Sequence, residues 1–191
     1  MAGAQAHGGA GELLDGLVHA ARADAPWAFE RIYDQLAPPV AGYLRMRGAA
    51  DPEGLTNEVM LGVFRGLAGF EGDGAAFRSW VFTIAHRRLV DDHRRRGARP
   101  RTTELTDGDR REPRGDVEEE ALARLGDGRV GRLLERLTAE QRDVILLRVV
   151  ADLSVDEVAT ILDKRPGAVK MLQRRGLAAI RRTLEAEGVT S

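Results

Sequence analysis

The sequence lacks several features that would indicate particular classes of protein. It contains no cysteine, which excludes a disulfide framework and thiolate metal sites. No apolar run approaches the roughly 20 residues that cross a bilayer, and residues 1–14 lack the basic-then-apolar order of a secretion signal. Aromatic residues make up only 5% of the 191 residues, against 43% hydrophobic residues overall. We therefore expect a cytoplasmic protein without membrane insertion, built from two small domains.

Charge is distributed unevenly along the chain, although the formal net charge is only −1. Residues 86–101 contain seven arginines against two acids, and residues 164–182 contain seven basic residues and no acid. Between these two basic stretches, residues 102–128 hold nine acids against four arginines. This pattern predicts a disordered N-terminus at 1–11, a domain at 12–98, a flexible acidic linker at 99–128 and a second domain at 129–187.

Helix-start signals dominate the second domain. Thr138 with Gln141, and Ser154 with Glu157, each match a capping box, in which two side chains satisfy the free N–H groups of a first helical turn. Pro166 suits the first position of a third helix, which carries much of the basic stretch. A short helix, a turn of about three residues and a longer basic helix predict a helix-turn-helix that enters the DNA major groove. The alternative is a solvated basic face on an ordinary helical hairpin.

Two helical patterns, at 27–45 and 55–67, begin the first domain. In the second pattern Leu55, Val59, Val63 and Leu67 form one apolar row, and Met60 and Phe64 form another beside it. So wide a stripe indicates either a deeply buried helix or a helix that also meets a partner.

A glycine-rich loop at 69–74 precedes another predicted helix, whose first half is aromatic and whose second half is rich in arginine. Aromatic rings beside arginines suit single-stranded DNA, because bases stack on rings while cations follow phosphates. The alternative is that these aromatic side chains belong to the core.

Two long stretches carry a resemblance to a known family. The stretch "YDQLAPPVAGYLRMRGAADPEGLTNEVMLGVFRGLAGFEGDGAAFRSWVFTIAHRRLVDDHRRR" resembles the promoter-melting domain of extracytoplasmic-function (ECF) sigma factors, and "LLERLTAEQRDVILLRVVADLSVDEVATILDKRPGAVKMLQRRGLAAIRRTL" resembles their C-terminal domain. Together they cover most of residues 27–184. The resemblance implies an all-α fold, with a sigma region 2-like helical bundle and a sigma region 4-like helix-turn-helix.

The resemblance also implies a role for particular residues. Candidates for binding core RNA polymerase are Asp51, Asn57, Glu58, Met60 and Phe64. Candidates for recognising and melting the minus-ten element are Glu71, Gly72, Asp73, Trp80, Arg87, Arg88, Arg94 and Arg95. Candidates for contacting minus-thirty-five DNA are Arg148, Arg165, Lys170, Met171, Arg174 and Arg175.

The partners implied are core RNA polymerase, through the clamp helices of its largest subunit and the flap of its second-largest subunit, promoter DNA and an anti-sigma factor. No cofactor, metal or catalytic residue is expected. The chain departs from the family pattern at Gly54, Asn57, Asp163 and Arg165, and it carries Gly176 inside a predicted helix.

Two other functions are compatible with parts of the sequence. One is a helix-turn-helix regulator that binds DNA without joining the polymerase. The other is a metal-dependent phosphohydrolase that uses His86, His93, Asp91 and Asp92, although two histidines seven residues apart lie two turns apart on one helix.

Overall fold

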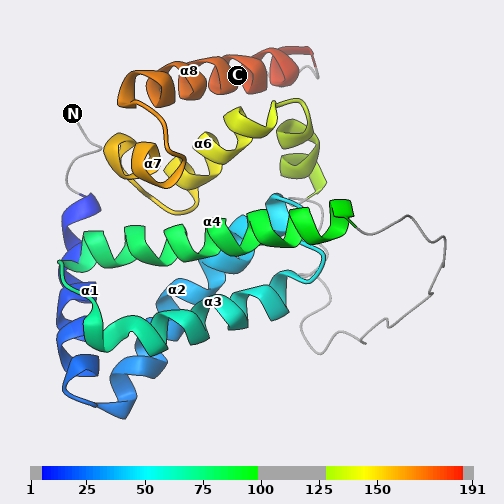
Figure 1. Ribbon diagram of the computed structural model, residues 1–191. Coiled ribbons are helices and arrows are strands. Elements are labelled where there is room, and N and C mark those ends of the chain that lie inside the picture. Colours follow the sequence, from blue (N-terminus) through cyan, green and yellow to red (C-terminus); the bar gives the residue numbers. More distant parts are fainter. Residues whose placement is uncertain (1–5, 99–127, 187–191) are drawn as a thin grey trace, which may run out of the picture.

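The computed structural model describes residues 6–98 and 128–186, which form helices and turns without a strand (Figure 1). Their order is α1 (Ala6–Arg22), α2 (Pro26–Met46), α3 (Pro52–Gly66), the 3-10 helix η1 (Leu67–Gly69), α4 (Gly74–Ala98), α6 (Ala139–Val149), α7 (Val155–Ile161) and α8 (Pro166–Ala186). Residues 128–135 are also helical. The expected all-α fold is confirmed. No helix within the two described ranges is long and apolar enough to span a membrane.

The N-terminal module consists of α1–α4 packed around a shared core. Its largest fully buried side chains include Tyr43 from α2 and Phe77 and Phe82 from α4. The ring of Tyr43 packs edge-on against Phe82 at 5.9 Å between centroids. Residues 6–11, expected to be disordered, instead form the first turns of α1. Residues 1–5 and nearly all of the predicted linker lie outside the described residues.

Helix α3 begins at Pro52, three residues before the predicted start at residue 55. Asp51 is its N-cap, because the Asp51 carboxylate accepts a hydrogen bond from the Gly54 backbone N–H at 2.8 Å. Leu55, Val59, Val63 and Leu67 are all buried, so the wide apolar stripe faces the core of this module.

The C-terminal module contains both predicted capping boxes. The Thr138 and Ser154 side chains cap α6 and α7, and Gln141 and Glu157 reach back to the N-cap N–H groups. Helices α7 and α8 are joined by the short turn at 162–165, which gives the expected helix-turn-helix. Both predictions from the local sequence are therefore confirmed.

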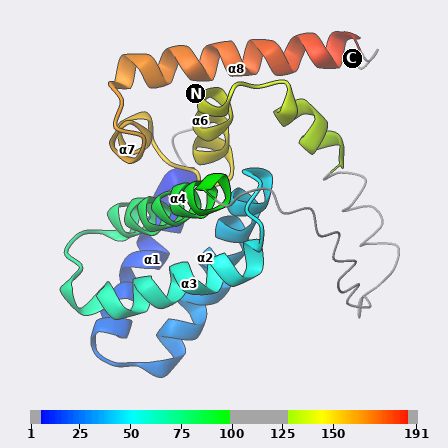
Figure 2. The same ribbon diagram turned by 45° about the vertical axis from the view of Figure 1, so that its right-hand side comes forward.

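The two modules lie directly against each other. Helix α4 runs across the middle of the molecule, with α1–α3 on one side and α6–α8 on the other (Figures 1 and 2). Helix α4 contacts α7, and α7 in turn contacts α8. The recognition helix of the helix-turn-helix thus lies at the outer edge of the molecule, separated from α4 by α6 and α7.

Candidate nucleic-acid and polymerase interface

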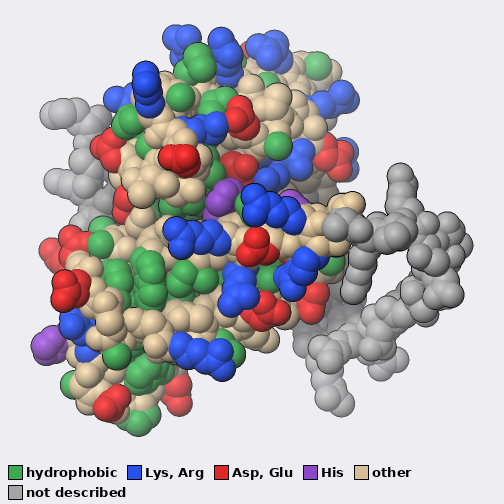
Figure 3. Space-filling view, viewed as in Figure 1, with side chains coloured by type: hydrophobic (Ala, Val, Ile, Leu, Met, Phe, Trp, Pro, Cys, Tyr) green, Lys and Arg blue, Asp and Glu red, His purple; other side chains and the backbone are tan. Residues whose placement is uncertain are grey.

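The outer face of α8 carries the predicted minus-thirty-five contacts. Lys170, Met171, Arg174 and Arg175 are exposed, and their spacing of one and four residues gives them one common face of the helix. Val169 and Leu172 are buried and attach α8 to α6 and α7. Figure 3 shows Lys and Arg side chains gathered along the edge of the molecule formed by α8. The structure therefore brings four of the six predicted residues together on one positive surface.

The other two predicted minus-thirty-five residues lie apart from this row. Arg165 is exposed in the turn that immediately precedes α8. Arg148, at the end of α6, is only partly exposed, and its guanidinium donates a hydrogen bond to the Leu153 carbonyl. In this structure Arg148 therefore stabilises the turn between α6 and α7.

Three aromatic side chains form a cluster beside the predicted base-capture loop. Trp80 stacks on Phe70 with ring centroids 5.1 Å apart, and Phe77 packs against both rings. Trp80 is partly buried, and its ring lies so close to Gly66 that a Cβ at Gly66 would come within 2.9 Å. The cluster therefore belongs to the core, as the alternative predicted, and Trp80 keeps one partly exposed edge; binding of DNA bases to that edge stays a prediction.

The loop that follows Phe70 is held by two features of its own. Glu71, Gly72 and Asp73 are all exposed, and Gly72 adopts φ 148°, a conformation that favours glycine. The Asp73 carboxylate accepts a hydrogen bond from the Ala76 N–H at 2.8 Å and so caps the start of α4. The three predicted loop residues therefore lie together, exposed, next to the aromatic cluster.

The C-terminal half of α4 exposes the four predicted arginines. Arg87, Arg88, Arg94 and Arg95 are all accessible to solvent. Arg88 lies 3.6 Å from the Glu58 carboxylate of α3, and both side chains are about half exposed. Such an exposed pair contributes little to stability, so these arginines remain available to phosphate groups.

The predicted polymerase surface lies on α3 and the adjoining face of α2. Asp51, Asn57 and Glu58 are exposed, and the Tyr33 hydroxyl donates a hydrogen bond to the Asn57 side-chain carbonyl at 2.9 Å. A shallow cavity of about 370 Å³ opens beside Asn57, lined by Tyr33, Ala37, Pro38, Ala41, Thr56 and Asn57 among others. The sequence prediction did not name Tyr33, which lines this cavity beside Ala37, Pro38 and Ala41 and is 40% exposed.

Two apolar residues predicted for this surface behave differently. Phe64 is partly exposed and packs edge-on against Phe29 at 5.4 Å. Met60 is only 1% exposed, so its side chain belongs to the core of the N-terminal module. Its predicted contact with a partner is corrected accordingly, because no partner reaches a side chain buried among α1–α4.

A buried polar cluster lies where the two modules meet, and the sequence did not indicate it. Arg47, at the end of α2, forms a salt bridge with Asp143 of α6, and its Nη2 donates to Asp143 Oδ2 at 3.1 Å. The Tyr43 hydroxyl lies 2.8 Å from Nδ1 of His86 on α4. Burial raises the pKa of Tyr43, and the nearby Asp143 carboxylate adds to this effect.

Burial also governs the two titratable partners in this cluster. It raises the pKa of Asp143 despite the opposing Arg47 guanidinium, and it lowers the pKa of His86 despite the Asp143 carboxylate. His86 is thus held by Tyr43 rather than paired with another histidine. Among residues 6–98 and 128–186, no group of three or more His, Asp or Glu side chains is arranged to hold a metal ion.

Family models match both modules of this chain. Residues 32–99 match sigma-70 region 2, and residues 127–180 match sigma-70 region 4. The two models match in the order that the resemblance implies, with region 2 before region 4.

Similar curated proteins include two named ECF RNA polymerase sigma factors. BldN of Streptomyces coelicolor is 36% identical over 173 residues, which is 88% of this chain and 64% of BldN. This chain therefore spans just under two thirds of the length of BldN. SigD of Mycobacterium tuberculosis is 30% identical over 184 residues, which is 93% of this chain and 87% of SigD.

Similar solved structures share the fold at lower identity. CnrH, solved in complex with the cytosolic domain of CnrY, has a TM-score of 0.65 at 22% identity, covering 91% of this chain and 97% of CnrH. RpoE of Bartonella quintana, solved with the anti-sigma factor NepR, has a TM-score of 0.60 at 17% identity, covering 82% of this chain and 96% of RpoE.

Proposed function

Because this chain belongs to the ECF RNA polymerase sigma factors of the sigma-70 family, we propose that it binds core RNA polymerase, directs it to particular promoters and stabilises their melted DNA. The region 4 module contacts the minus-thirty-five element through α8. The region 2 module contacts core polymerase through α2 and α3, and minus-ten DNA through α4 and the loop before it.

One observation carries this proposal. A single chain combines an exposed, basic helix-turn-helix recognition helix with a second arginine-rich helix that begins at an aromatic cluster and an exposed loop. A helix-turn-helix regulator needs only the first of these features. The second suits unstacked bases, since rings and a loop can receive a base while arginines follow the backbone.

The proposed factor carries out no chemical step of its own. A ligand shifts an equilibrium only by its preference for one state, so the work of melting comes from tighter binding to open than to closed promoter DNA. Extruding a base costs about a few kcal/mol, which contacts from the loop at 71–73 and the Trp80 edge offset. Core polymerase supplies the catalyst and brings two weak DNA contacts together.

Promoter-specific transcription with purified core polymerase tests the proposal. We expect core polymerase with this protein to start transcription at sites that core polymerase alone ignores, and mapping of the starts then yields the two promoter elements. A helix-turn-helix regulator that does not join the polymerase would leave initiation by the core unchanged, and that result would contradict the proposal.

The first prediction concerns the exposed row on α8. Replacing Lys170 or Arg174 by alanine should weaken binding to minus-thirty-five duplex by ~1–3 kcal/mol if the residue reads a base, as measured by fluorescence anisotropy. Binding to core polymerase should stay at the wild-type level, because these side chains lie on the opposite module from α3. Arg182→Ala is the matched control, since Arg182 is another exposed arginine of α8 about three turns beyond Lys170.

We also propose a protein inhibitor of the anti-sigma class as a partner. The RpoE neighbour was solved with a protein named as an anti-sigma factor, and ECF relatives match most of this chain. A factor that works on polymerase and DNA acts in the cytoplasm. Co-purification of the chain with the product of a neighbouring gene is a direct way to find the inhibitor.

A further inference from the structure

The start of α4 is held by a side chain from α1. The Asp15 carboxylate accepts a hydrogen bond from the backbone N–H of Gly74, the first residue of α4, although the two residues are 59 positions apart. Gly74 is buried and directly follows the exposed loop at 71–73. Asp15 lies outside residues 32–99, which match sigma-70 region 2. A helix that precedes the matched region therefore anchors one end of this loop.

The hydrogen bond satisfies a backbone group that α4 cannot pair by itself. The first N–H groups of an α-helix have no carbonyl partner within the helix, and a buried N–H without an acceptor is costly. Asp73 accepts from the Ala76 N–H at 2.8 Å, and Asp15 accepts from the Gly74 N–H. Two carboxylates, one from the loop and one from α1, therefore share the first turn of α4. Their negative charge also suits the positive end of the helix dipole.

The other end of the loop is fixed by packing. Phe70 is buried against aromatic rings of α4. Gly72 turns so tightly that a Cβ there would lie 2.9 Å from the Cβ of Ala76 and 3.0 Å from the Phe70 ring. The loop is thus held between the aromatic cluster on one side and the hydrogen bond of Asp15 to Gly74 on the other.

Such an anchor affects how much contact with a base contributes to binding. Ordering a flexible segment on binding costs conformational entropy, whereas a segment that is already ordered avoids most of that cost. Extruding a base from the stack also costs free energy, which contacts to the loop must offset. A loop fixed at both ends before DNA arrives leaves more of its contact free energy for this purpose.

We propose that Asp15 is a positioning residue for base capture: its carboxylate fixes the loop at 71–73 in the shape that receives an unstacked minus-ten base. This inference rests on the proposed function, since it takes that loop as the base receptor. Asp15 acts through Gly74 rather than by touching DNA. Its removal should therefore loosen the loop and weaken capture, and leave the DNA face of α8 and the polymerase surface on α2 and α3 unaffected.

Amide hydrogen exchange tests the anchor without polymerase or DNA. Asp15→Ala removes the acceptor, so the Gly74 amide and its neighbours in the loop should exchange roughly fivefold faster, as expected for loss of a helix cap. Asp15→Asn keeps a side-chain carbonyl that can accept the same hydrogen bond, so its exchange should stay near the wild-type rate. Unchanged exchange at Gly74 in Asp15→Ala would overturn the anchor.

Glu12→Ala is the matched control for loss of an acid from α1. Glu12 lies three residues before Asp15, but it lines the groove between α1 and α2, together with Leu13 and Trp27. Glu12→Ala should leave loop exchange at the wild-type rate. A rate that rises as much in Glu12→Ala as in Asp15→Ala would assign the effect to charge on α1, and the hydrogen bond would be rejected as its cause.

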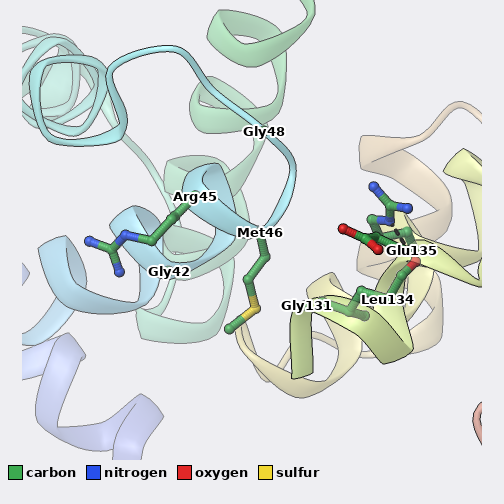
Figure 4. A pocket seen from close by; sticks show the side chains of 8 residues that line it. Gly42, Arg45, Met46, Gly48, Gly131, Leu134 and Glu135 are labelled. Carbon is green, nitrogen blue, oxygen red and sulfur yellow. Dashed lines mark hydrogen bonds between the residues drawn. The ribbon is translucent and has the colours of Figure 1, made fainter. Parts of the chain in front are cut away.

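Met46→Ala controls for a general loss of stability. The Met46 side chain extends from α2 into a cavity of about 310 Å³, which Gly131 of the other module also lines (Figure 4). This cavity lies toward the far end of α4 from Gly74, because the carbonyl of the adjoining Gly48 accepts from Arg96 and α4 has 25 residues, or about 37 Å. Met46→Ala should lower the midpoint of thermal unfolding yet leave loop exchange unchanged. A loop that loosens equally in this variant would contradict a local anchor.

An abasic scan tests whether the anchor serves base capture. Core polymerase with this protein is bound to a promoter duplex whose minus-ten region is already melted by mismatches, and the bases of the displaced strand are removed one at a time. One abasic position should weaken the wild-type complex, because the loop then lacks its base. Asp15→Ala should weaken the complex on intact DNA by about threefold or more, and should make that same position nearly silent.

The coupling between residue and base distinguishes positioning from stability. A residue that only stabilises the fold weakens the intact and the abasic probe by the same factor, so equal losses on the two probes would overturn the role in capture. Asp15→Asn should restore the effect of the abasic position. Affinity for core polymerase and for minus-thirty-five duplex should stay at the wild-type level in both variants, because those contacts are proposed for α3 and α8.

The inference and the proposed function fail in different ways. Hydrogen exchange is measured on the free chain, so it judges the anchor alone. Failure of promoter-specific transcription would overturn the proposed function, and the capture role with it, while the exchange result would stand. Equal losses on intact and abasic probes, in a protein that does direct transcription, would overturn only the inference.

Discussion

At the scale of single residues, three aspartates adopt a conformation usually left to glycine. Asp24, Asp152 and Asp163 have φ values of 56°, 52° and 51°, and each follows the end of a helix. A left-handed residue at this point stops the helix and lets the chain turn, and glycine adopts it without a steric cost. The sequence analysis names Asp163 as a departure from the family pattern, and its positive φ is a conformation that glycine adopts without a steric cost.

Asp163 supplies the second prediction. Asp163→Gly should raise the free energy of unfolding by about 0.5–1 kcal/mol, because glycine removes the strain of a side chain at positive φ. Asp163→Ala should lower it, since alanine lacks the short polar side chain that tolerates this conformation. Urea denaturation of the three proteins gives both values, and a glycine variant less stable than the alanine variant would contradict the explanation.

At the scale of helices, local signals determined most of what the sequence could predict. Both capping boxes and the start of α8 at Pro166 are encoded within four residues, so the sequence predicted them without tertiary information. The sequence did not predict the burial of Met60, which depends on neighbours that are remote in the chain. It also did not predict the hydrogen bond of Arg148, whose acceptor lies in a turn.

Gly176 is a further case that only helix packing explains. It costs about 1 kcal/mol relative to alanine within a helix, yet it is buried where α8 meets α6. A Cβ at this position would lie 3.1 Å from Cγ1 of Ile145 and 3.5 Å from the Cβ of Gln141. Glycine therefore permits the close approach of the two helices.

The third prediction follows from this close approach. Gly176→Val should destabilise the protein by about 1–3 kcal/mol, because a branched side chain overfills a packed helix contact. In an Ile145→Ala background, Gly176→Val should lower the free energy of unfolding by less than it does in the wild type, because the nearest atoms are gone. Thermal denaturation of the single and double variants measures the coupling, and strictly additive effects would argue against contact at this point.

At the scale of the whole molecule, the relation between the modules was beyond the reach of sequence reasoning. The order of motifs predicted two domains and their boundaries, but nothing local links Arg47 to a partner 96 positions later. Buried ion pairs leave no periodic signal, since each member resembles any other charged residue in the sequence.

The contact between the two modules also predicts how the molecule unfolds. Scanning calorimetry of the wild type should give one cooperative transition, because the modules share buried contacts and one continuous hydrophobic cluster. Arg47→Asp should divide this transition into two, and the midpoint temperature of the lower one should fall most. Arg45→Glu should keep the single transition, because Arg45 pairs with Glu53 of its own module. Two separate transitions in the wild type would show that the modules unfold independently.

The stacking of Trp80 on Phe70 has a practical consequence as well. The chain has two tryptophans, and Trp27 lies 56% exposed near the start of α2. A Trp27→Phe protein would hold a single indole, placed beside the loop proposed to capture a base. Its intrinsic fluorescence would then report strand separation in real time, with no dye on either protein or DNA.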